Sequence, residues 1–416
     1  MIKVIDDRMG TSKTSAIIQH INLTKKNQKY IFVTPFLDEV KRVRDSCQFI
    51  EPEVDEKNKT KLQSFKDLLL KNLNIVTTHS LFKSLDVETI EILNEKDYVL
   101  VLDEVLDVVA ETTLTKTDVK ALLDLKIIKE VDGELISGDE NILKSYQGDW
   151  EYMEVVNNLL RHTLEFFRNS KSKSNEKIAL MWLFPIDLIK SFKEIYILTY
   201  CFDGYPLKHY LDLHNISQKK YSVEILNPEA EYEDRKYRFI DYRVRSNKDI
   251  KSLVKILSGT VINLIGDNEH SFSVSWYKNK FSKSEISTQL RKNLLNVSKK
   301  RLTHNAQKDI MWTTFKKNSD ALYNEKLKEH NLIAHNIRAT NEFRDKKSLI
   351  YLVNRRYNPV IYQWFIEKGI KIDEKEFSLG EMTQWIWRAQ IRDGLPIEIY
   401  IPSSRMRKLL IEWLDL

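Results

Sequence analysis

Residues 3–18 read KVIDDRMGTSKTSAII, and this stretch decides how the first part of the chain folds. Val4 and Ile5 predict a strand, a polar turn follows, and apolar residues from position 16 onward recur at helical spacing. Lys-Thr at the mouth of a helix suits phosphate, because backbone N–H groups and the helix dipole attract the anion. Lys13 would reach the β- and γ-phosphates and Thr14 would reach Mg²⁺. The stretch therefore indicates a nucleoside triphosphate site made of Gly10, Thr11, Ser12, Lys13 and Thr14.

The loop departs from the strict phosphate-loop pattern at two positions. Asp7 and Ser12 stand where that pattern has glycine. Ser12 is the more serious departure, because glycine at that position lets the backbone approach the phosphates. An ordinary strand–turn–helix with a solvated lysine and threonine is the alternative reading of the loop.

The composition describes a soluble globular protein of two or three domains. The chain has 416 residues, of which 42% are hydrophobic and 30% charged. A formal charge of +6 is compatible with nucleic acid binding without demonstrating it. Cys47 and Cys201 lie far apart, which fits a reducing compartment and argues against a disulfide scaffold or a zinc site. No apolar run approaches the ~18 residues of a membrane span, and the chain enters a strand at once, so we expect a cytoplasmic protein without a membrane partner.

Strand and helix signals alternate through the first hundred residues. Apolar runs at 30–33, 73–77 and 98–102 predict buried strands, and 36–49 predicts a helix. Such runs separated by helices indicate a parallel sheet covered on both faces, with ligands at the carboxyl ends of the strands. Further strands are predicted at 178–182 and 194–199. Residues from about 107 to 177 lose the rhythm and are interpreted as a helical insertion, so the first domain is placed at 1–205.

The second half, 206–416, repeats the alternation and is interpreted as a second α/β domain. Strands are predicted at 260–265, 271–276, 348–353 and 397–401. Between them, residues 278–317 form a basic, helix-like region with little acid to balance it. Trp276 and Tyr277, just before this region, are candidates for base stacking but are more often core residues.

Two carboxylates end the apolar run 100–102. Asp103 is placed to hold Mg²⁺ through water, and Glu104 to orient or deprotonate an attacking water. An acidic strand end beside a helix N-terminus is the common alternative. Two strand–helix units separate this pair from Lys13, which favours the functional interpretation.

A helix is predicted from Ser378, which has capping-box form, to about Arg392, ending at Gly394. Gln384, Arg388 and Arg392 recur every four residues and would line one stripe of it. Arginine stays charged and spans two oxygens, so such a stripe can reach a γ-phosphate. A solvated polar stripe opposite an apolar face is the alternative.

Together these pieces resemble the superfamily 2 helicases, which are DEAD/DEAH-box-like nucleic acid motors. The resemblance extends to replicative helicases encoded by tailed bacteriophages and rests on the order and spacing of several segments: MGTSKTSAII, FVTPFLDEV, VLDEV, ILTYCFDG, FSVSWY, RATNEFRDKKSLIYLVN, TQWIWRAQIRDG and YIPSSRMRKLL. It covers most of the chain outside 107–177. It implies two RecA-like parallel-sheet domains, the first with a helical insertion.

The resemblance also implies roles for individual residues. Gly10, Thr11, Ser12, Lys13 and Thr14 match the phosphate loop, and Asp103 and Glu104 match the Mg²⁺ and water-activating pair. Thr34, Pro35, Thr77 and Thr78 match segments that touch the nucleic acid backbone, as do Thr340 and Asn341, which alternatively sense nucleotide. Thr199 matches the motif that couples hydrolysis to domain movement. Gln384 and Arg388 match the motif that contacts the triphosphate, with Arg388 as arginine finger and Arg392 as a second finger one residue beyond the usual spacing.

The resulting prediction is an ATP- and Mg²⁺-dependent helicase or translocase for phage DNA replication. Its expected partners are single-stranded or forked DNA and other replication proteins, and a phage-encoded chain would work in the bacterial host cytoplasm. One alternative is a weakly hydrolysing, ATP-switched nucleic acid binder or loader. A kinase-type phosphotransferase is a second alternative, but it leaves the Gln384–Arg392 helix and the second domain without a role. No His/Cys or carboxylate cluster suggests a nuclease.

Overall fold

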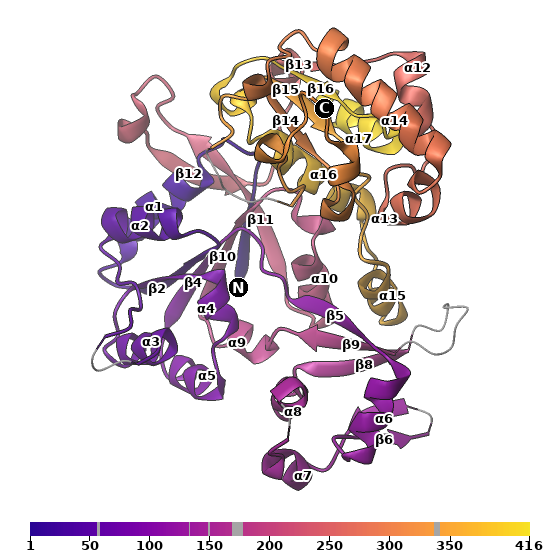
Figure 1. The fold of residues 1–416 in the computed structure, drawn as a ribbon. Helices are drawn as coiled ribbons and strands as arrows, with labels where there is room; N and C mark the ends of the chain where they lie inside the picture. Colours follow the sequence, from indigo (N-terminus) through magenta and orange to yellow (C-terminus); the bar gives the residue numbers. More distant parts are fainter. Residues whose placement is uncertain (56–58, 133, 149, 169–177, 337–341) are drawn as a thin grey trace. The chain divides into compact units, whose positions relative to one another are not determined.

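The computed structural model describes residues 1–55, 59–132, 134–148, 150–168, 178–336 and 342–416 (Figure 1). The chain forms two compact units, which are described separately. Unit 1 consists of Met1–Asp6, Lys13–Asp241 and Asn358–Ile372. Unit 2 consists of Asp7–Ser12, Tyr242–Tyr357 and Asp373–Leu416.

Unit 1 is built on a seven-stranded sheet in the order β12-β11-β1-β10-β4-β2-β3. All neighbouring pairs are parallel except β11 with β12. The strands are β1 (Ile2–Asp6), β2 (Lys29–Thr34), β3 (Ile75–Thr78), β4 (Tyr98–Asp103), β10 (Glu194–Thr199), β11 (Gln218–Ile225) and β12 (Tyr237–Asp241). The strands predicted in the first two hundred residues are confirmed, and the parallel α/β class with them. The sheet also continues past residue 205, because β11 pairs with β1.

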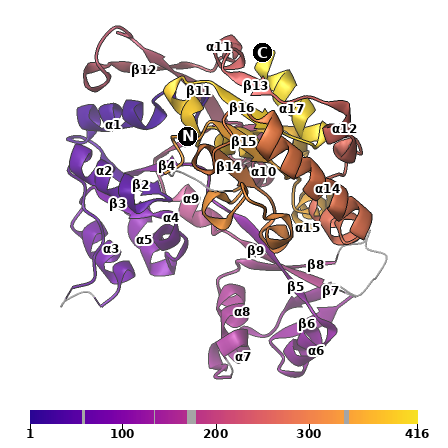
Figure 2. The same cartoon turned by 45° about the horizontal axis from the view of Figure 1, so that its top comes forward.

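Helices cover this sheet because their apolar stripes meet alternate residues of the strands. Ile17 of α1 (Lys13–Thr24) and Val40 of α2 (Leu37–Cys47) share one core cluster with Phe32 and Val101, which lie on a single face of the sheet. Figure 2 shows α1 beside β12 at one end of this layer. The remaining helices of the Rossmann-type layer are α3 (Lys61–Leu70), α4 (His79–Lys83), α5 (Val87–Asn94), α9 (Ile186–Lys190) and α10 (Pro206–Leu213).

The insertion predicted to be helical is mixed, and the prediction is corrected accordingly. Its described elements are β5 (Val109–Leu114), α6 (Lys116–Asp124), β6 (Ile128–Val131), β7 (Glu134–Ser137), α7 (Glu140–Ser145), α8 (Trp150–Leu160) and β8 (Leu164–Arg168). β5 and β8 flank β9 (Ile178–Leu183) in an antiparallel sheet. The polar composition concealed these strands, because antiparallel strands with one solvated face lack a continuous apolar run.

A late segment of the chain returns to unit 1. Helix α15 (Pro359–Glu367) packs against β5. Its flanks are tied to the insertion, since the Asn358 amide donates to Glu111 (3.4 Å) and Lys368 pairs with Glu165 (2.7 Å). Sequence position alone would have placed α15 in the second domain.

Unit 2 contains a four-stranded parallel sheet in the order β13-β16-β15-β14. Its strands are β13 (Val254–Ile256), β14 (Ile310–Thr313), β15 (Ser348–Tyr351) and β16 (Ile397–Tyr400). The strands predicted at 348–353 and 397–401 are confirmed. Those predicted at 260–265 and 271–276 are wrong, because these segments form α12 (Thr260–Asn263) and α13 (Val274–Trp276). A short apolar run does not distinguish a strand from a buried helical turn.

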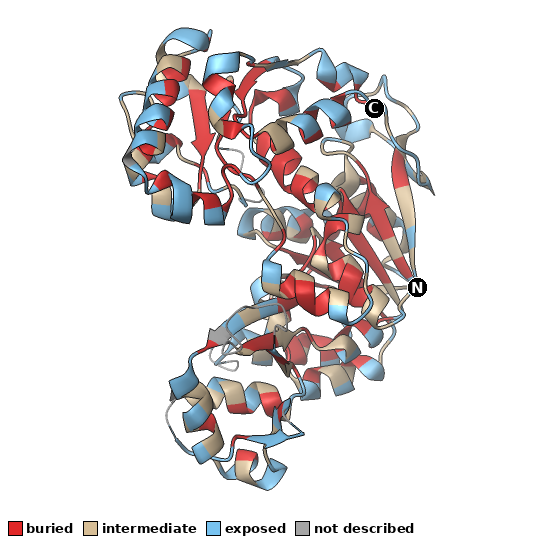
Figure 3. Cartoon of the chain, turned by 90° about the vertical axis from the view of Figure 1, so that its right-hand side faces the viewer, coloured by how far each residue is buried: buried red, intermediate tan, exposed pale blue. Residues whose placement is uncertain are grey.

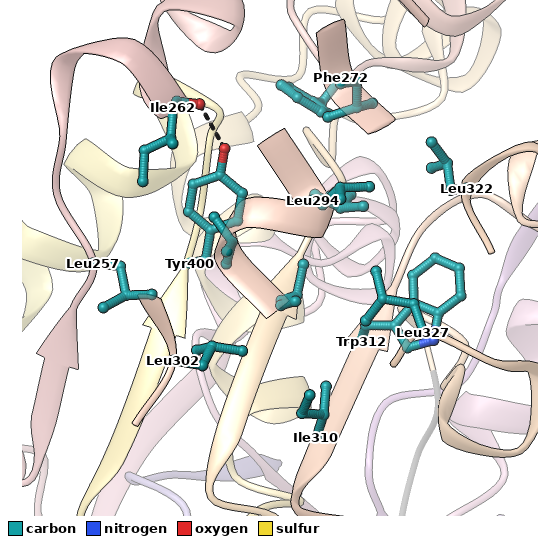
Figure 4. Packing of buried hydrophobic residues seen from close by; sticks show 14 of the residues in the cluster. Leu257, Ile262, Phe272, Leu294, Leu302, Ile310, Trp312, Leu322, Leu327 and Tyr400 are labelled. Carbon is teal, nitrogen blue, oxygen red and sulfur yellow. Dashed lines mark hydrogen bonds between the residues drawn. The ribbon is translucent and has the colours of Figure 1, made fainter. Parts of the chain in front are cut away.

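One core cluster joins a face of this sheet to the helices between residues 257 and 327. Trp312 of β14 and Tyr400 of β16 meet Leu294 of α14 (Ser284–Asn296), and the Tyr400 hydroxyl donates to the Ile262 carbonyl at 2.6 Å (Figure 4). Trp276 and Tyr277 belong to the same cluster and are buried. Their side chains are therefore core residues. Figure 3 shows buried residues concentrated on the central strands of the two main sheets and exposed residues mostly on helices, loops and outer strands such as β12.

A carboxylate lies inside the unit 2 sheet. Glu398 on β16 is 4% exposed and accepts hydrogen bonds from Ser348 Oγ (2.8 Å), the His304 backbone N–H (2.9 Å) and Thr303 Oγ1 (3.1 Å). Burial by itself would raise its pKa, but these donors lower the pKa below its ordinary value. The ionised carboxylate is thus satisfied locally and joins β15 and β16 to the loop before β14.

The remaining helices of unit 2 are α11 (Lys248–Lys251), α16 (Glu374–Ile386) and α17 (Ser404–Leu414). Within the described ranges, no helix is both long and apolar enough to cross a membrane.

Candidate nucleotide site

The loop between β1 and α1 turns sharply through two left-handed residues. Gly10 has φ +80° and Ser12 has φ +63°. Glycine adopts this conformation freely, whereas an L side chain pays about 1–2 kcal/mol for it. Ser12 therefore carries backbone strain at the position where the strict pattern has glycine. Lys13 follows directly as the first residue of α1, so it lies at the N-terminal end of that helix.

Asp103 lies at the carboxyl end of β4, beside the start of α1. The Thr14 hydroxyl is 3.4 Å from Asp103 Oδ1, and the Thr34 hydroxyl is 3.5 Å from Oδ2. Burial raises the pKa of Asp103 to about 8, with smaller contributions from Glu39 and Glu104 that Lys13 opposes. A hydroxyl and a carboxylate so placed offer the hard oxygen ligands that Mg²⁺ takes alongside water and phosphate. Thr14 and Asp103 are of the residue types that would suit Mg²⁺.

Glu104 is held in a second strained conformation. Its φ is +68°, and its backbone N–H donates to the Leu198 carbonyl of β10 at 2.9 Å. Among the described residues, neither Glu104 Oε2 nor the Thr199 hydroxyl has a hydrogen-bond partner, although both atoms are buried. Strained residues and unsatisfied buried polar atoms are concentrated at functional sites. Both groups lie at the carboxyl edge of neighbouring strands, which is where an open parallel sheet binds its ligand.

A buried ionic group at the end of β1 was missed from the sequence. Asp6 is 3% exposed, accepts from the Phe202 N–H (3.3 Å) and pairs with Lys220 (3.0 Å), which also contacts Asp203 (2.5 Å). Burial raises the pKa of Asp6, and the lysine opposes that rise. Lys220 lies 214 residues beyond Asp6, so no local pattern could have paired them. The group joins β1, β11 and the turn after β10.

Asp7 and Arg8 are tied to the segment 245–249 within unit 2. The Arg245 guanidinium donates to both oxygens of Asp7, at 2.6 and 2.8 Å. Arg8 donates to both oxygens of Asp249, at 2.8 and 2.6 Å, and to Asn247 Oδ1 at 3.2 Å. Two bidentate arginine–carboxylate pairs fix an orientation as well as a distance. The first glycine of the strict loop pattern is thus replaced by a residue with a specific partner.

The threonines predicted to touch nucleic acid are the last residues of β2 and β3. Thr34 and Thr77 are buried, whereas Thr78 is partly exposed and caps α4 by accepting from the Leu81 N–H at 3.3 Å. Pro35 follows Thr34 and is partly exposed. Thr340 and Asn341 lie outside the described residues.

The predicted stripe of Gln384, Arg388 and Arg392 is not formed on one helix. α16 begins after Asp373, which caps it by accepting from Glu376 N–H at 2.9 Å, and it ends at Ile386. The chain then turns through an extended Ala389 into the 3₁₀ turn Gln390–Asp393, which Gly394 ends. The helix prediction is therefore corrected: the helix begins earlier, with Asp373 rather than Ser378 as its N-cap, and it ends earlier, at Ile386.

The three side chains consequently differ in environment. Gln384 is buried in α16, Arg388 is half-buried just beyond it, and Arg392 is exposed. Trp387, next to Arg388, approaches the loop: a Cβ on Gly10 would lie 3.3 Å from Trp387 Cζ2. Glycine at position 10 is therefore favoured both by the left-handed turn and by the close approach of Trp387.

The fold and the site define an α/β protein with a lysine loop at the carboxyl edge of a parallel sheet. Residues 248–414 match the YonV C-terminal Rossmann-like domain. The whole chain is 38% identical over 427 residues to the SPbeta prophage-derived uncharacterized protein YonV of Bacillus subtilis (strain 168), covering 100% of this chain and 98% of that protein. The chain belongs to the YonV family.

Solved structures with a similar chain path are more distant. S. tokodaii Xpd4 aligns with a TM-score of 0.40 and 11% identity, over 99% of this chain and 93% of that one. The DUF1998 helicase MrfA bound to DNA and AMPPNP aligns with a TM-score of 0.31 and 10% identity, over 99% of this chain and 47% of that one. At these scores and identities the two alignments carry no argument about function.

Proposed function

We propose that this chain is a nucleic acid-dependent ATPase that works as a helicase or translocase, with DNA as its track during phage replication. The observation that carries the proposal is the meeting of Thr14, at the start of α1, with Asp103 at the end of β4 (3.4 Å between side-chain oxygens). Lys13 precedes this threonine and Glu104 follows this aspartate. A phosphate-binding helix start and a carboxylate pair are the two parts that phosphoryl transfer to water requires.

Each residue has a defined part in the proposed reaction. The backbone of Gly10–Thr14 and the Lys13 ammonium would bind the β- and γ-phosphates. Thr14, and Asp103 through water, would hold Mg²⁺, whose positive charge would offset that of the phosphates when the ion is bound. Glu104 would accept a hydrogen bond from the attacking water and orient it. Arg388, with Gln384 and Arg392, would contact the γ-phosphate as charge develops on it.

Hydrolysis would be coupled to movement along a strand. Thr199, whose buried hydroxyl lacks a described partner, lies on β10 between β1 and β4, where it can respond to the state of the phosphates. Thr34, Pro35, Thr77 and Thr78 would contact the nucleic acid backbone, and the same role is proposed for Thr340 and Asn341. Contacts with phosphate make such binding largely independent of base sequence.

The test is steady-state ATP hydrolysis by the purified chain with Mg²⁺, with and without single-stranded DNA or RNA. The variants Lys13→Ala and Glu104→Gln remove the phosphate contact and the water-orienting carboxylate, and Lys26→Ala, an exposed lysine beyond α1, serves as the matched control. We expect stimulation by one polymer, at least a hundredfold loss in both site variants, and full activity in the control. The polymer that stimulates would identify the track.

Binding of ATP and nucleic acid without stimulated turnover would reject the motor. It would favour the ATP-switched binder or loader, for which the strain at Ser12 supplies a physical cause. Hydrolysis that survives in Glu104→Gln would remove that residue from the proposed reaction.

A further inference from the structure

The basic segment 278–317 of unit 2 has no part in the proposed nucleotide site. It contains eleven Lys and Arg against two Asp and Glu. The whole chain has 66 basic residues (Lys and Arg) and 60 acidic residues (Asp and Glu). The segment therefore has a net charge of +9, and the rest of the chain, with 55 basic and 58 acidic residues, has a net charge of −3. The positive net charge of the protein thus comes entirely from about a tenth of its length.

These charges point away from the core. Most apolar residues of the segment, among them Leu290, Leu294 and Val297, enter the cluster that covers a face of the unit 2 sheet. Ten of the eleven basic residues are instead exposed. Exposed basic residues are Lys278, Lys280, Lys283, Arg291, Lys292, Lys300, Arg301, Lys308, Lys316 and Lys317.

Acidic residues do not neutralise this surface. None of the ten exposed side chains forms an ion pair within the described residues. The eleventh basic residue, Lys299, is partly buried and forms an ion pair with Glu325 at 2.6 Å. One of the two acidic residues, Asp309, is also partly buried and forms an ion pair with Lys347 at 3.5 Å. Glu285 is the one exposed acid of the segment. Ten like charges without ion-pair partners among the described residues repel one another, and a bound polyanion would relieve that repulsion.

We propose that the outer surface of residues 278–317 binds the phosphate backbone of single-stranded nucleic acid. The proposal rests on the proposed function and adds to it a binding surface outside the threonine segments. Lysine and arginine on flexible stems can follow a phosphate chain without reading its bases. The aromatic residues beside them, Trp276, Tyr277 and Phe281, are buried in the core, so the surface offers no platform for stacking. Binding there is therefore electrostatic and indifferent to base composition.

The salt dependence of binding measures the number of phosphates contacted. For single strands, the slope of log K against log salt is about −0.7 for each phosphate contact. The test variant neutralises four residues of the surface: Lys280→Gln, Lys292→Gln, Lys300→Gln and Arg301→Gln. The control variant removes the same charge from unit 1: Lys26→Gln, Lys71→Gln, Lys120→Gln and Lys129→Gln.

Fluorescence anisotropy of a labelled 20-nucleotide strand, titrated from 0.05 to 0.5 M NaCl, reads out the slope. We expect the test variant to lower its magnitude by about 3 if all four residues contact phosphate, equally for oligo-dT and for a mixed sequence. The control should keep the wild-type slope. A third variant combines Lys280→Arg, Lys292→Arg and Lys300→Arg, which keep the positive charge. It should also keep the wild-type slope, and this result would separate the effect of lost charge from that of altered folding.

Other outcomes overturn the inference in distinguishable ways. Equal slopes in the test and control variants, with tight wild-type binding, reject this surface and leave the proposed function standing. Absence of wild-type binding at 0.05 M NaCl rejects the proposed function itself. Equally tight binding of polyglutamate, lost in the test variant, would show a surface for an acidic protein instead.

Discussion

Replacing Asp7 by glycine restores the strict phosphate-loop pattern at that position, and we expect the change to be harmful. Asp7 is 3% exposed. Its carboxylate accepts hydrogen bonds from Nε and Nη2 of Arg245. Its Oδ1 also accepts from the backbone N–H of Arg8 at 2.8 Å. Asp7 is not among the residues with positive φ. Glycine therefore relieves no strain there and only removes a partner from the arginine.

The magnitude follows from burial. Removing one partner of a fully buried ion pair costs about 3–5 kcal/mol. The Arg245 side chain is 26% exposed, so water can partly replace the lost carboxylate, and we reduce the figure to about 2 kcal/mol. The added freedom of glycine in the unfolded chain contributes about 0.5–1 kcal/mol more. A loss of about 2–3 kcal/mol lowers the melting temperature of a unit of 150–250 residues by about 4–12 °C.

Thermal unfolding followed by tryptophan fluorescence measures this, since Trp312 and Trp385 lie in the core of unit 2. Asp7→Asn keeps the shape and one acceptor and should lose less. Arg245→Gln removes the other partner, and the double variant Asp7→Asn/Arg245→Gln closes a mutant cycle with a coupling energy above about 1 kcal/mol. An Asp7→Gly protein that melts at or above the wild-type temperature, or a coupling near zero, would refute the reasoning.

Four further outcomes are expected. Ser12→Gly releases a left-handed conformation and should stabilise the protein by up to about 1 kcal/mol, read as a higher urea midpoint; an unchanged midpoint would contradict the strain. Gly266→Ala places a Cβ 1.9 Å from the Pro402 carbonyl oxygen and should melt unit 2 at a clearly lower temperature, whereas tolerance would show that this backbone can move apart. The pKa of Glu398 is lowered on folding, so its contribution is present above the unfolded pKa of about 4.5 and is lost as pH falls through the lower folded value; Glu398→Gln should flatten the stability–pH curve in this range. Burial raises the pKa of Cys47 to about 11, so iodoacetamide at pH 8 should label it far more slowly in the native than in the urea-unfolded chain, as mass spectrometry can follow.

Local patterns were sufficient where one element decides its own conformation. Apolar runs located β1 to β4 and β10, and the Lys-Thr pair located the start of α1, because a strand buried on both faces and a helix start both leave a continuous signature. The same patterns placed Asp103 and Glu104 correctly at a strand end. They failed at 260–265, where an apolar run is as short as a buried helical turn, and in the insertion, where half-exposed strands look polar.

The sequence by itself determined the lysine loop, the acidic strand end and the parallel direction of the strands between them. Only the tertiary structure decided the partners of the loop: Arg245 for Asp7, Asp249 for Arg8 and Lys220 for Asp6. It also decided that α15 belongs with unit 1 and that Leu290, Leu294 and Val297 enter the unit 2 core while ten basic residues of 278–317 stay exposed. The physical reason is that periodicity reports which side of an element is buried, whereas a pairing across more than two hundred residues depends on how the sheets bring distant segments together.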